Sequence, residues 1–238
     1  MAEYTLHREA VLASEAPLEA RRDFIKKTYA HLAAAIFGFM ALEYLLVESP
    51  LGLSITRLTL GNGRMGWLAV IGAFILVGWI ADRWSRSTTS PGMQYLGLGL
   101  YVAAEAVIFV PVLFLCTYLT RYDGLIATAG TITAIAFAGL TAVVFITKAD
   151  FSWLRTFLWA GMLVAMGVAV ASLLFGFHVG VIYSGAVVLL AAGYILYYTS
   201  NVLHRYPIGF HVAAALALFS AVALMFWYVL RILMSGRR

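Results

Sequence analysis

Two glutamates are the residues most able to do chemistry in this chain, because each lies within a long apolar stretch. Glu105 is near the middle of its stretch, and Glu43 is close to the end of another. Charge inside a bilayer is costly and often functional, so Glu105 is predicted to respond to a proton or a cation. The alternative is a neutral carboxyl bonded to a neighbouring helix. For Glu43, a side chain that reaches the membrane interface is the favoured interpretation.

Other kinds of chemistry find little support. The lysines are Lys26, Lys27 and Lys148, so the last three apolar stretches hold none for a retinal Schiff base. No cluster of His, Asp or Glu has metal-ligand spacing within a helix, and no phosphate loop or G-x-S-x-G nucleophile is present. The single Cys116 cannot form an internal disulfide. We therefore predict a protein that is not an enzyme and that has no metal site and no cofactor.

The composition indicates where these residues must lie. The 238 residues are 63% hydrophobic and 11% charged, whereas a soluble domain has about 45–50% apolar and about 25% charged residues. A soluble fold of this size could not bury so much apolar surface. The sixteen Lys and Arg residues are spread thinly between apolar blocks, which is typical of topology signals and not of a nucleic-acid surface. The predicted partner is the lipid bilayer.

Seven apolar segments are long enough to cross a membrane as helices, and they predict an all-α integral membrane protein. Breaks at Glu48–Pro50, Gly61–Gly63, Ser90–Gly92 and Tyr122–Gly124 separate several of them, and Pro111 predicts a bend in the third. Residues 1–28 form the expected N-terminal tail, and residues 29–234 the membrane domain. The segments are Tyr29–Val47, Met65–Ala81, Met93–Leu119, Gly124–Ile146, Leu154–Phe177, Val179–Tyr198 and His211–Leu233.

Basic residues predict the orientation of these segments. The tail and the loops on its side carry ten Lys and Arg residues, and the opposite loops carry Arg57, Arg64 and Arg121. This asymmetry places the N-terminus in the cytoplasm. Seven crossings then place Arg231, Arg237 and Arg238 toward the other side. The tail has mixed charge and no apolar core, so it is not expected to be a cleaved signal peptide.

Small residues at four-residue spacing mark two of the segments. The fifth contains Gly161, Ala165 and Ala169, and the seventh contains Ala213, Ala217 and Ala221. Small faces let helix backbones approach closely in lipid. The seventh segment is therefore expected to be surrounded by other helices.

Two polar motifs occupy the ends of apolar segments. One is the run Thr147-Lys148-Ala149-Asp150-Phe151-Ser152, and the other begins at Thr199-Ser200 and ends at His204. Together with the basic stretch from Arg21 to Lys27, they resemble the Bax inhibitor-1 family of seven-helix membrane proteins, most of all its bacterial YccA branch. The resemblance covers about residues 21–233 and implies six helices around a central last helix.

The resemblance also implies two activities. One is binding and modulation of an FtsH-type membrane protease, with the N-terminal tail as a contact, in the bacterial inner membrane. The other is a pH-sensitive leak of Ca²⁺, which would make Ca²⁺ or H⁺ a partner. The sequence favours the first, a non-enzymatic regulator in quality control or stress response, and keeps the cation leak, with Glu105 lining its path, as the alternative.

The chain departs from the leak pattern at two positions. Members with that activity carry a pair of aspartates where this chain has Tyr198 and Ala221. Two close carboxylates share protons and so sense pH, and that pair cannot be built here. Glu105 is the candidate substitute. Lys148 and Asp150 either form a contact or latch, or belong to a turn in which Asp150 caps the following helix. Tyr198, Thr199 and His204 form a polar cluster or lie at the inner interface.

Overall fold

The protein is a bundle of helices. The computed structural model describes residues 11–88, 90–118 and 124–236, and these ranges form eight α-helices and no strand. Seven of the helices are long and apolar enough to cross a membrane. The predicted all-α, seven-span class is therefore confirmed. Arg8, Arg121, Arg237 and Arg238, which the orientation argument uses, lie outside the described residues.

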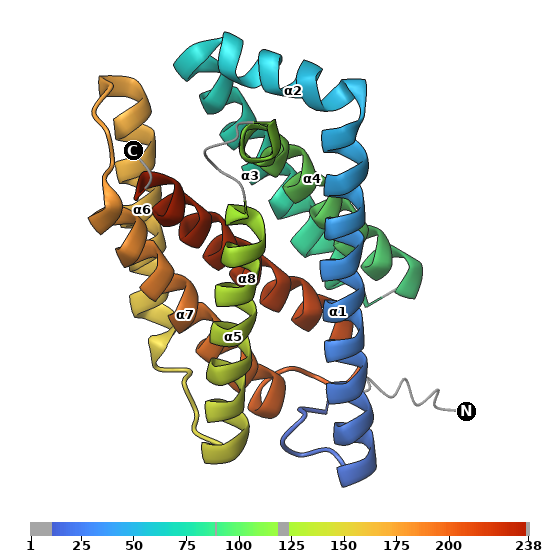
Figure 1. The fold of residues 1–238 in the computed structure, drawn as a ribbon. Coiled ribbons are helices and arrows are strands. Elements are labelled where there is room, and N and C mark those ends of the chain that lie inside the picture. Colours follow the sequence, from blue (N-terminus) through green and yellow to red (C-terminus); the bar gives the residue numbers. More distant parts are fainter. Residues whose placement is uncertain (1–10, 89, 119–123, 237–238) are drawn as a thin grey trace.

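The spanning helices follow the apolar segments closely. Their order along the chain can be followed in Figure 1. The first begins at Leu18, so residues 18–28 of the expected tail are already helical. The seven are α1 (Leu18–Glu48), α3 (Gly63–Ser85), α4 (Pro91–Tyr118), α5 (Leu125–Thr147), α6 (Leu154–Phe175), α7 (Val181–His204) and α8 (His211–Ser235).

A short eighth helix, α2 (Pro50–Gly61), lies across one end of the bundle between α1 and α3 (Figure 1). Pro50 occupies its first turn, where proline's missing N–H costs nothing. Gly52 lies against the last turn of α1, and a Cβ atom there would come within 2.6 Å of the Leu46 carbonyl oxygen. The sequence indicated the breaks on both sides of α2 but not the helix, which is too short to give a span signal.

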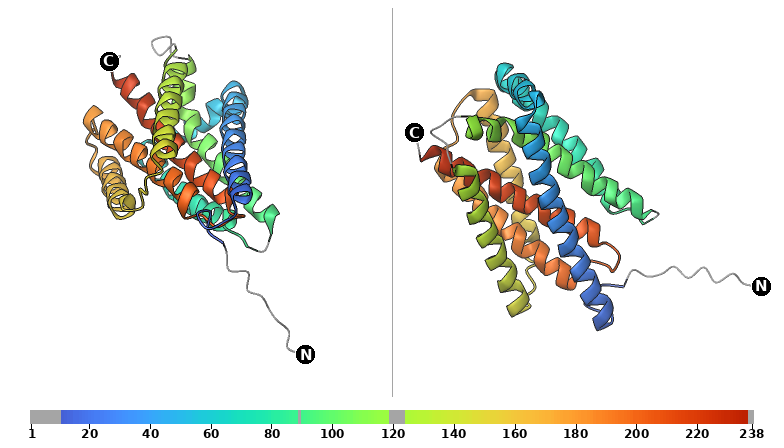
Figure 2. Two further views of the ribbon diagram at one scale, coloured as in Figure 1. Left: turned by 90° about the horizontal axis from the view of Figure 1, so that it is seen from below. Right: turned by 45° about the vertical axis from the view of Figure 1, so that its right-hand side comes forward.

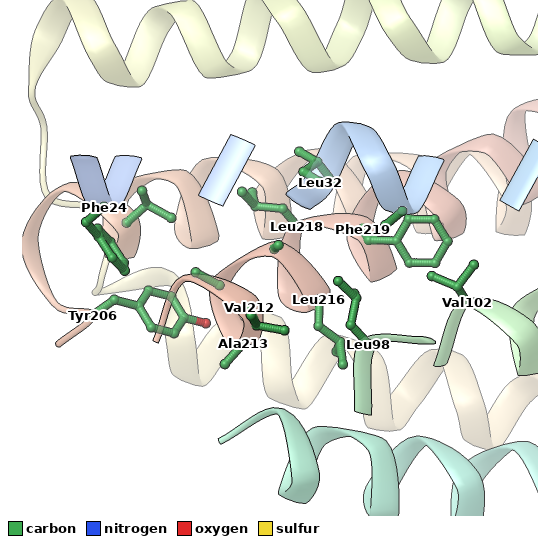
Figure 3. Close-up of a cluster of buried hydrophobic side chains, with 14 of the residues drawn as sticks. Phe24, Leu32, Leu98, Val102, Tyr206, Val212, Ala213, Leu216, Leu218 and Phe219 are labelled. Carbon is green, nitrogen blue, oxygen red and sulfur yellow. The ribbon is translucent and has the colours of Figure 1, made fainter. Parts of the chain in front are cut away.

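The last helix is the centre of the bundle, as predicted. In the apolar 18-residue stretch of α8, 67% of the residues are buried inside the bundle, a larger share than in any other spanning helix. Its alanine face, including Ala213 and Ala217, lets α1, α3, α4, α5 and α7 pack against it, and Figure 2 shows its course among them. In Figure 3, Phe219 and Leu218 of α8 lie among side chains of α1 and α4.

The two ends of the bundle differ. We call the end where α1 begins the amino-terminal end, and the end where α8 finishes the carboxy-terminal end. Residues 11–17, the N-terminal strap, lie against the connection between α7 and α8. The Ala13 N–H donates to the Tyr206 carbonyl at 2.9 Å, and the Ile208 N–H donates to the Val11 carbonyl at 2.9 Å. The Ser14 hydroxyl adds a bond to the His204 carbonyl at 2.9 Å.

Candidate functional site

A cavity of about 770 Å³ lies between α3, α4, α6, α7 and α8. It begins near the middle of the bundle and extends to the exposed residues His178, Gly180 and Ser235 at the carboxy-terminal end. Volumes of this size are typical of ligand sites. Helix α6 lies against α3 and α7 and faces α8 across this space.

Glu105 lines the inner part of the cavity from the middle of α4. Its side chain is buried, and the Tyr101 hydroxyl, one turn earlier on the same helix, donates to its Oε1 at 3.2 Å. Tyr198 of α7 and Ala221 of α8 line the same cavity. The three positions that the sequence singled out on different helices therefore meet on one surface.

Aromatic rings form much of the cavity wall. The Phe109 ring meets Trp227 edge-on at 4.8 Å, and Trp227 in turn lies 6.3 Å from Trp67. On the other side of Glu105, the Tyr101 ring lies 5.6 Å from Phe74. Sequence reasoning missed this arrangement, because the rings come from several helices and no local spacing relates them. Nine of the lining residues are aromatic: Trp67, Phe74, Tyr101, Phe109, Tyr183, Tyr194, Tyr198, Trp227 and Tyr228.

Basic groups lie at the outer part of the cavity. Arg231, near the end of α8, lines it together with His178, and its guanidinium is 3.5 Å from the Val179 carbonyl. On α8, Ser220 lines the cavity next to Phe219, whose ring lies 6.1 Å from that of Tyr101. Arg231 is three turns further along α8, which corresponds to about 16 Å along the helix axis. Arg64 instead packs against Gly176 at the same end of the molecule and does not line the cavity. The buried carboxyl and the half-buried cation therefore occupy opposite ends of the space.

Glu43 does not reach the membrane interface, so that interpretation is wrong. The side chain is 5% exposed, and no described residue donates a hydrogen bond to either carboxyl oxygen. The reason is that α2 and α4 both pack against the last turns of α1 and cover it. Glu43 does not line the cavity. The two candidate acids thus have different surroundings.

The two polar motifs meet at the amino-terminal end. We call Asp150, Ser152, Ser200 and Arg205 the motif cluster. The Phe151 N–H donates to Ser200 Oγ at 2.9 Å, and Ser200 Oγ donates to the Ala149 carbonyl at 3.2 Å. Arg205 donates to Asp150 Oδ2 at 2.9 Å and to Ser152 Oγ at 2.7 Å. The loop between α5 and α6 is therefore tied to the end of α7.

Asp150 has a different bonding role from the expected helix cap. The residue that precedes α6 is Trp153, and no side chain caps that helix. Asp150 Oδ1 instead accepts the Ser152 N–H at 2.9 Å. The hydrogen bond from Arg205, followed by the one from Ser152, lowers the pKa of Asp150 to about 2. The carboxylate is thus held in its charged form beside Arg205.

The remaining motif residues serve the backbone around this cluster. Thr147 Oγ1 donates to the Val143 carbonyl at 2.8 Å, and Lys148 ends α5 in the left-handed region with a φ of 52°. A His204 ring nitrogen bonds the Ser200 carbonyl at 3.0 Å. The Thr199 hydroxyl is buried near those of Tyr29 and Thr141, outside hydrogen-bond geometry. Tyr198 is apart from these groups, stacked on Tyr194 at 5.5 Å.

Fold and site together define a class of protein, the multi-pass helical membrane proteins built around a buried last helix. The family described as inhibitor of apoptosis-promoting Bax1 matches residues 21–238. The chain belongs to this family, the Bax inhibitor-1 family. An uncharacterised protein of Pseudomonas aeruginosa, PA2604, is 35% identical over 97 residues. That match covers 40% of this chain and 43% of the relative, so it spans less than half of either protein.

Proposed function

We propose that the protein is a cation leak in which Glu105 is the group that responds to a proton or to Ca²⁺. The observation that carries this proposal is the meeting of Glu105 with Tyr198 and Ala221 on one cavity. The last two occupy the positions of the acid pair in leak-forming relatives. A carboxyl on α4 thus supplies acid chemistry to the same space.

The closed half of the molecule lies between this cavity and the amino-terminal end. Leu98 and Val102 of α4 pack there with Leu218 of α8 in a buried apolar cluster, which Figure 3 shows from within the bundle. The N-terminal strap and the motif cluster lie beyond it. In this proposal, conduction requires these elements to separate.

Flux through reconstituted vesicles tests this function. Purified protein in vesicles loaded with a calcium dye should pass Ca²⁺, and Glu105→Gln should reduce the rate by about tenfold because it removes the one charge at the inner end. Glu43→Gln is the matched control: it removes an equally buried carboxyl that does not line the cavity, and its rate should stay near that of the unmodified protein.

Two outcomes would count against the leak. The leak is rejected if the calcium dye reports no flux at any pH from about 5 to about 8. A carboxyl in a perturbed site titrates within this range. Equal loss of flux in Glu105→Gln and Glu43→Gln would remove the assignment to Glu105.

A second candidate is a regulator of an FtsH-type protease in the bacterial inner membrane, with the N-terminus in the cytoplasm, as the resemblance to the YccA branch implies. One observation favours it. The N-terminal strap bonds the His204 and Tyr206 carbonyls, next to the ion pair of Arg205 with Asp150. The tail and both family motifs therefore form one surface that a partner could contact.

Co-purification from membranes tests the regulator. The full chain should enrich the protease, and a chain that lacks residues 1–17 but keeps α1 should enrich it much less. Arg205→Gln, which removes the ion pair and leaves the strap, separates the two parts of the surface. No enrichment by the full chain would contradict this candidate, whatever the vesicles show.

A further inference from the structure

The cavity around Glu105 has the features of a site for an organic molecule. It is about 770 Å³ in volume, far larger than a hydrated metal ion needs and within the range of sites for drug-sized ligands. Its wall is mostly aromatic and aliphatic. Of the described residues that line it, Glu105 is the single carboxyl. A small inorganic cation at Glu105 would leave most of this surface uncovered.

The arrangement of rings about the carboxyl indicates the charge of the ligand. Tyr101 bonds Glu105 directly at 3.2 Å, and Phe109 follows one turn later on the same face of α4. Phe109 leads to Trp227 at 4.8 Å. Aromatic faces attract cations, most strongly where water is excluded. A buried carboxyl in a cavity lined by several aromatic rings is a combination that suits an ammonium or phosphonium group.

The edge of the cavity indicates the rest of the ligand. Ile75 of α3 lines the cavity and is also 51% exposed, on the surface that a membrane helix presents to lipid. This edge of the cavity therefore borders lipid, and a ligand that reaches it is in contact with apolar surface. Such a ligand needs an apolar body.

We propose that this cavity binds a lipophilic organic cation, with its charged centre at Glu105 and its apolar body against Phe109, Trp227 and Trp67. This inference rests on the cavity of the proposed cation leak and deepens it by naming a ligand class that the cavity selects. Binding does not require the closed half to open, so it can be measured where no ion flows.

The test uses the full chain in detergent and two probes of nearly equal shape and opposite charge, tetraphenylphosphonium and tetraphenylborate. Equilibrium dialysis with labelled tetraphenylphosphonium, against micelles without protein, should show saturable binding at one site per chain. Glu105→Gln should weaken binding by about tenfold or more, since a desolvated charge pair is lost. Trp227→Leu should weaken it about threefold to tenfold through loss of aromatic contact with the apolar body of the ligand. In a separate dialysis, labelled tetraphenylborate should show no saturable binding.

Glu43→Gln is again the matched control and should bind like the unmodified chain. Each variant is first compared with the unmodified chain by gel filtration, and Trp227→Leu keeps the proposal testable if Glu105→Gln does not fold. The proposal is overturned by unsaturable binding of tetraphenylphosphonium, by equal weakening in Glu43→Gln, or by saturable binding of tetraphenylborate on its own. Binding of tetraphenylphosphonium to a protein that passes no Ca²⁺ would reject the leak and support this site. Ca²⁺ flux without such binding would support the leak and reject this site.

Discussion

Single residues explain how far the candidate site was visible in the sequence. Glu105 could be found because a carboxyl in an apolar helix is rare and costly. The neighbouring rings could not, because Trp67 and Trp227 are 160 positions apart, and tryptophan in a membrane helix most often marks an interface. Glu43 was misinterpreted from the same kind of signal. A carboxyl near the end of an apolar helix predicted a side chain that reaches the interface, but α2 and α4 cover it.

Asp150 offers a test at this scale that depends on pH. Its pKa falls from 3.8 to about 2 in the folded protein because of Arg205. The ion pair therefore stabilises the fold at pH values above 3.8, and the contribution is lost as the pH falls through about 2. We expect Asp150→Asn to lower the melting temperature slightly at neutral pH, since both partners are half-exposed.

The measurement is thermal unfolding in detergent over a series of acidic buffers, followed by circular dichroism. The difference between Asp150→Asn and the unmodified chain should stay constant down to about pH 5 and shrink below the ordinary carboxyl pKa. Arg205→Gln should show the same trend. A difference that is unchanged in strong acid would mean that the loop is held by Ser200 alone.

Whole elements were predicted where hydrophobicity alone defines them. The seven spans follow from local composition, and the central position of α8 followed from its alanine face. The close approach of the α3 and α4 backbones at Gly97 could not be predicted in this way. A Cβ atom on Gly97 would lie 2.6 Å from both the Ala81 carbonyl oxygen and the Ser85 nitrogen. These are backbone atoms, so α3 would have to move. The sequence has 21 glycines, and nothing local distinguishes this one.

Gly97→Ala should therefore destabilise the protein by about 1–3 kcal/mol, as overpacking does in well-packed cores. Gly99→Ala is the matched control on the same helix: no atom lies within 4 Å of its Cβ position, and alanine favours a helix over glycine by about 1 kcal/mol. Denaturation in mixed micelles with increasing sodium dodecyl sulfate would compare the two. Equal stability of both variants would show that α3 moves away at no cost.

The molecule as a whole has an odd number of spans, and this fixes the relation of its ends. α1 begins at one end of the bundle and α8 finishes at the other. The sequence indicated this parity, and it also indicated which end faces the cytoplasm from the positions of basic residues. The cavity could not be predicted from the sequence. Five helices supply its wall, and the rotation of each helix about its axis is set by packing, which hydropathy does not encode.

Reporter fusions test the arrangement of the whole chain. A reporter that fluoresces only in the cytoplasm should be active at the N-terminus and inactive at the C-terminus, and one that is active only outside should give the reverse. The excess of Lys and Arg on the N-terminal side predicts that the N-terminus is in the cytoplasm. Seven crossings then predict that the C-terminus is on the opposite side of the membrane. Activity of the same reporter at both ends would mean that one helix does not cross.

The one-ended cavity also determines where a membrane voltage acts on this protein. If solvent enters the cavity from the carboxy-terminal end, little of the voltage falls along that half. The electric field is then concentrated in the dry layer between Glu105 and the N-terminal strap. A unit charge crossing only this layer gains almost the full energy of the potential, about 2.3 kcal/mol per 100 mV. Any movement of charge past Glu105 is thereby coupled to the membrane voltage more steeply than its short path suggests.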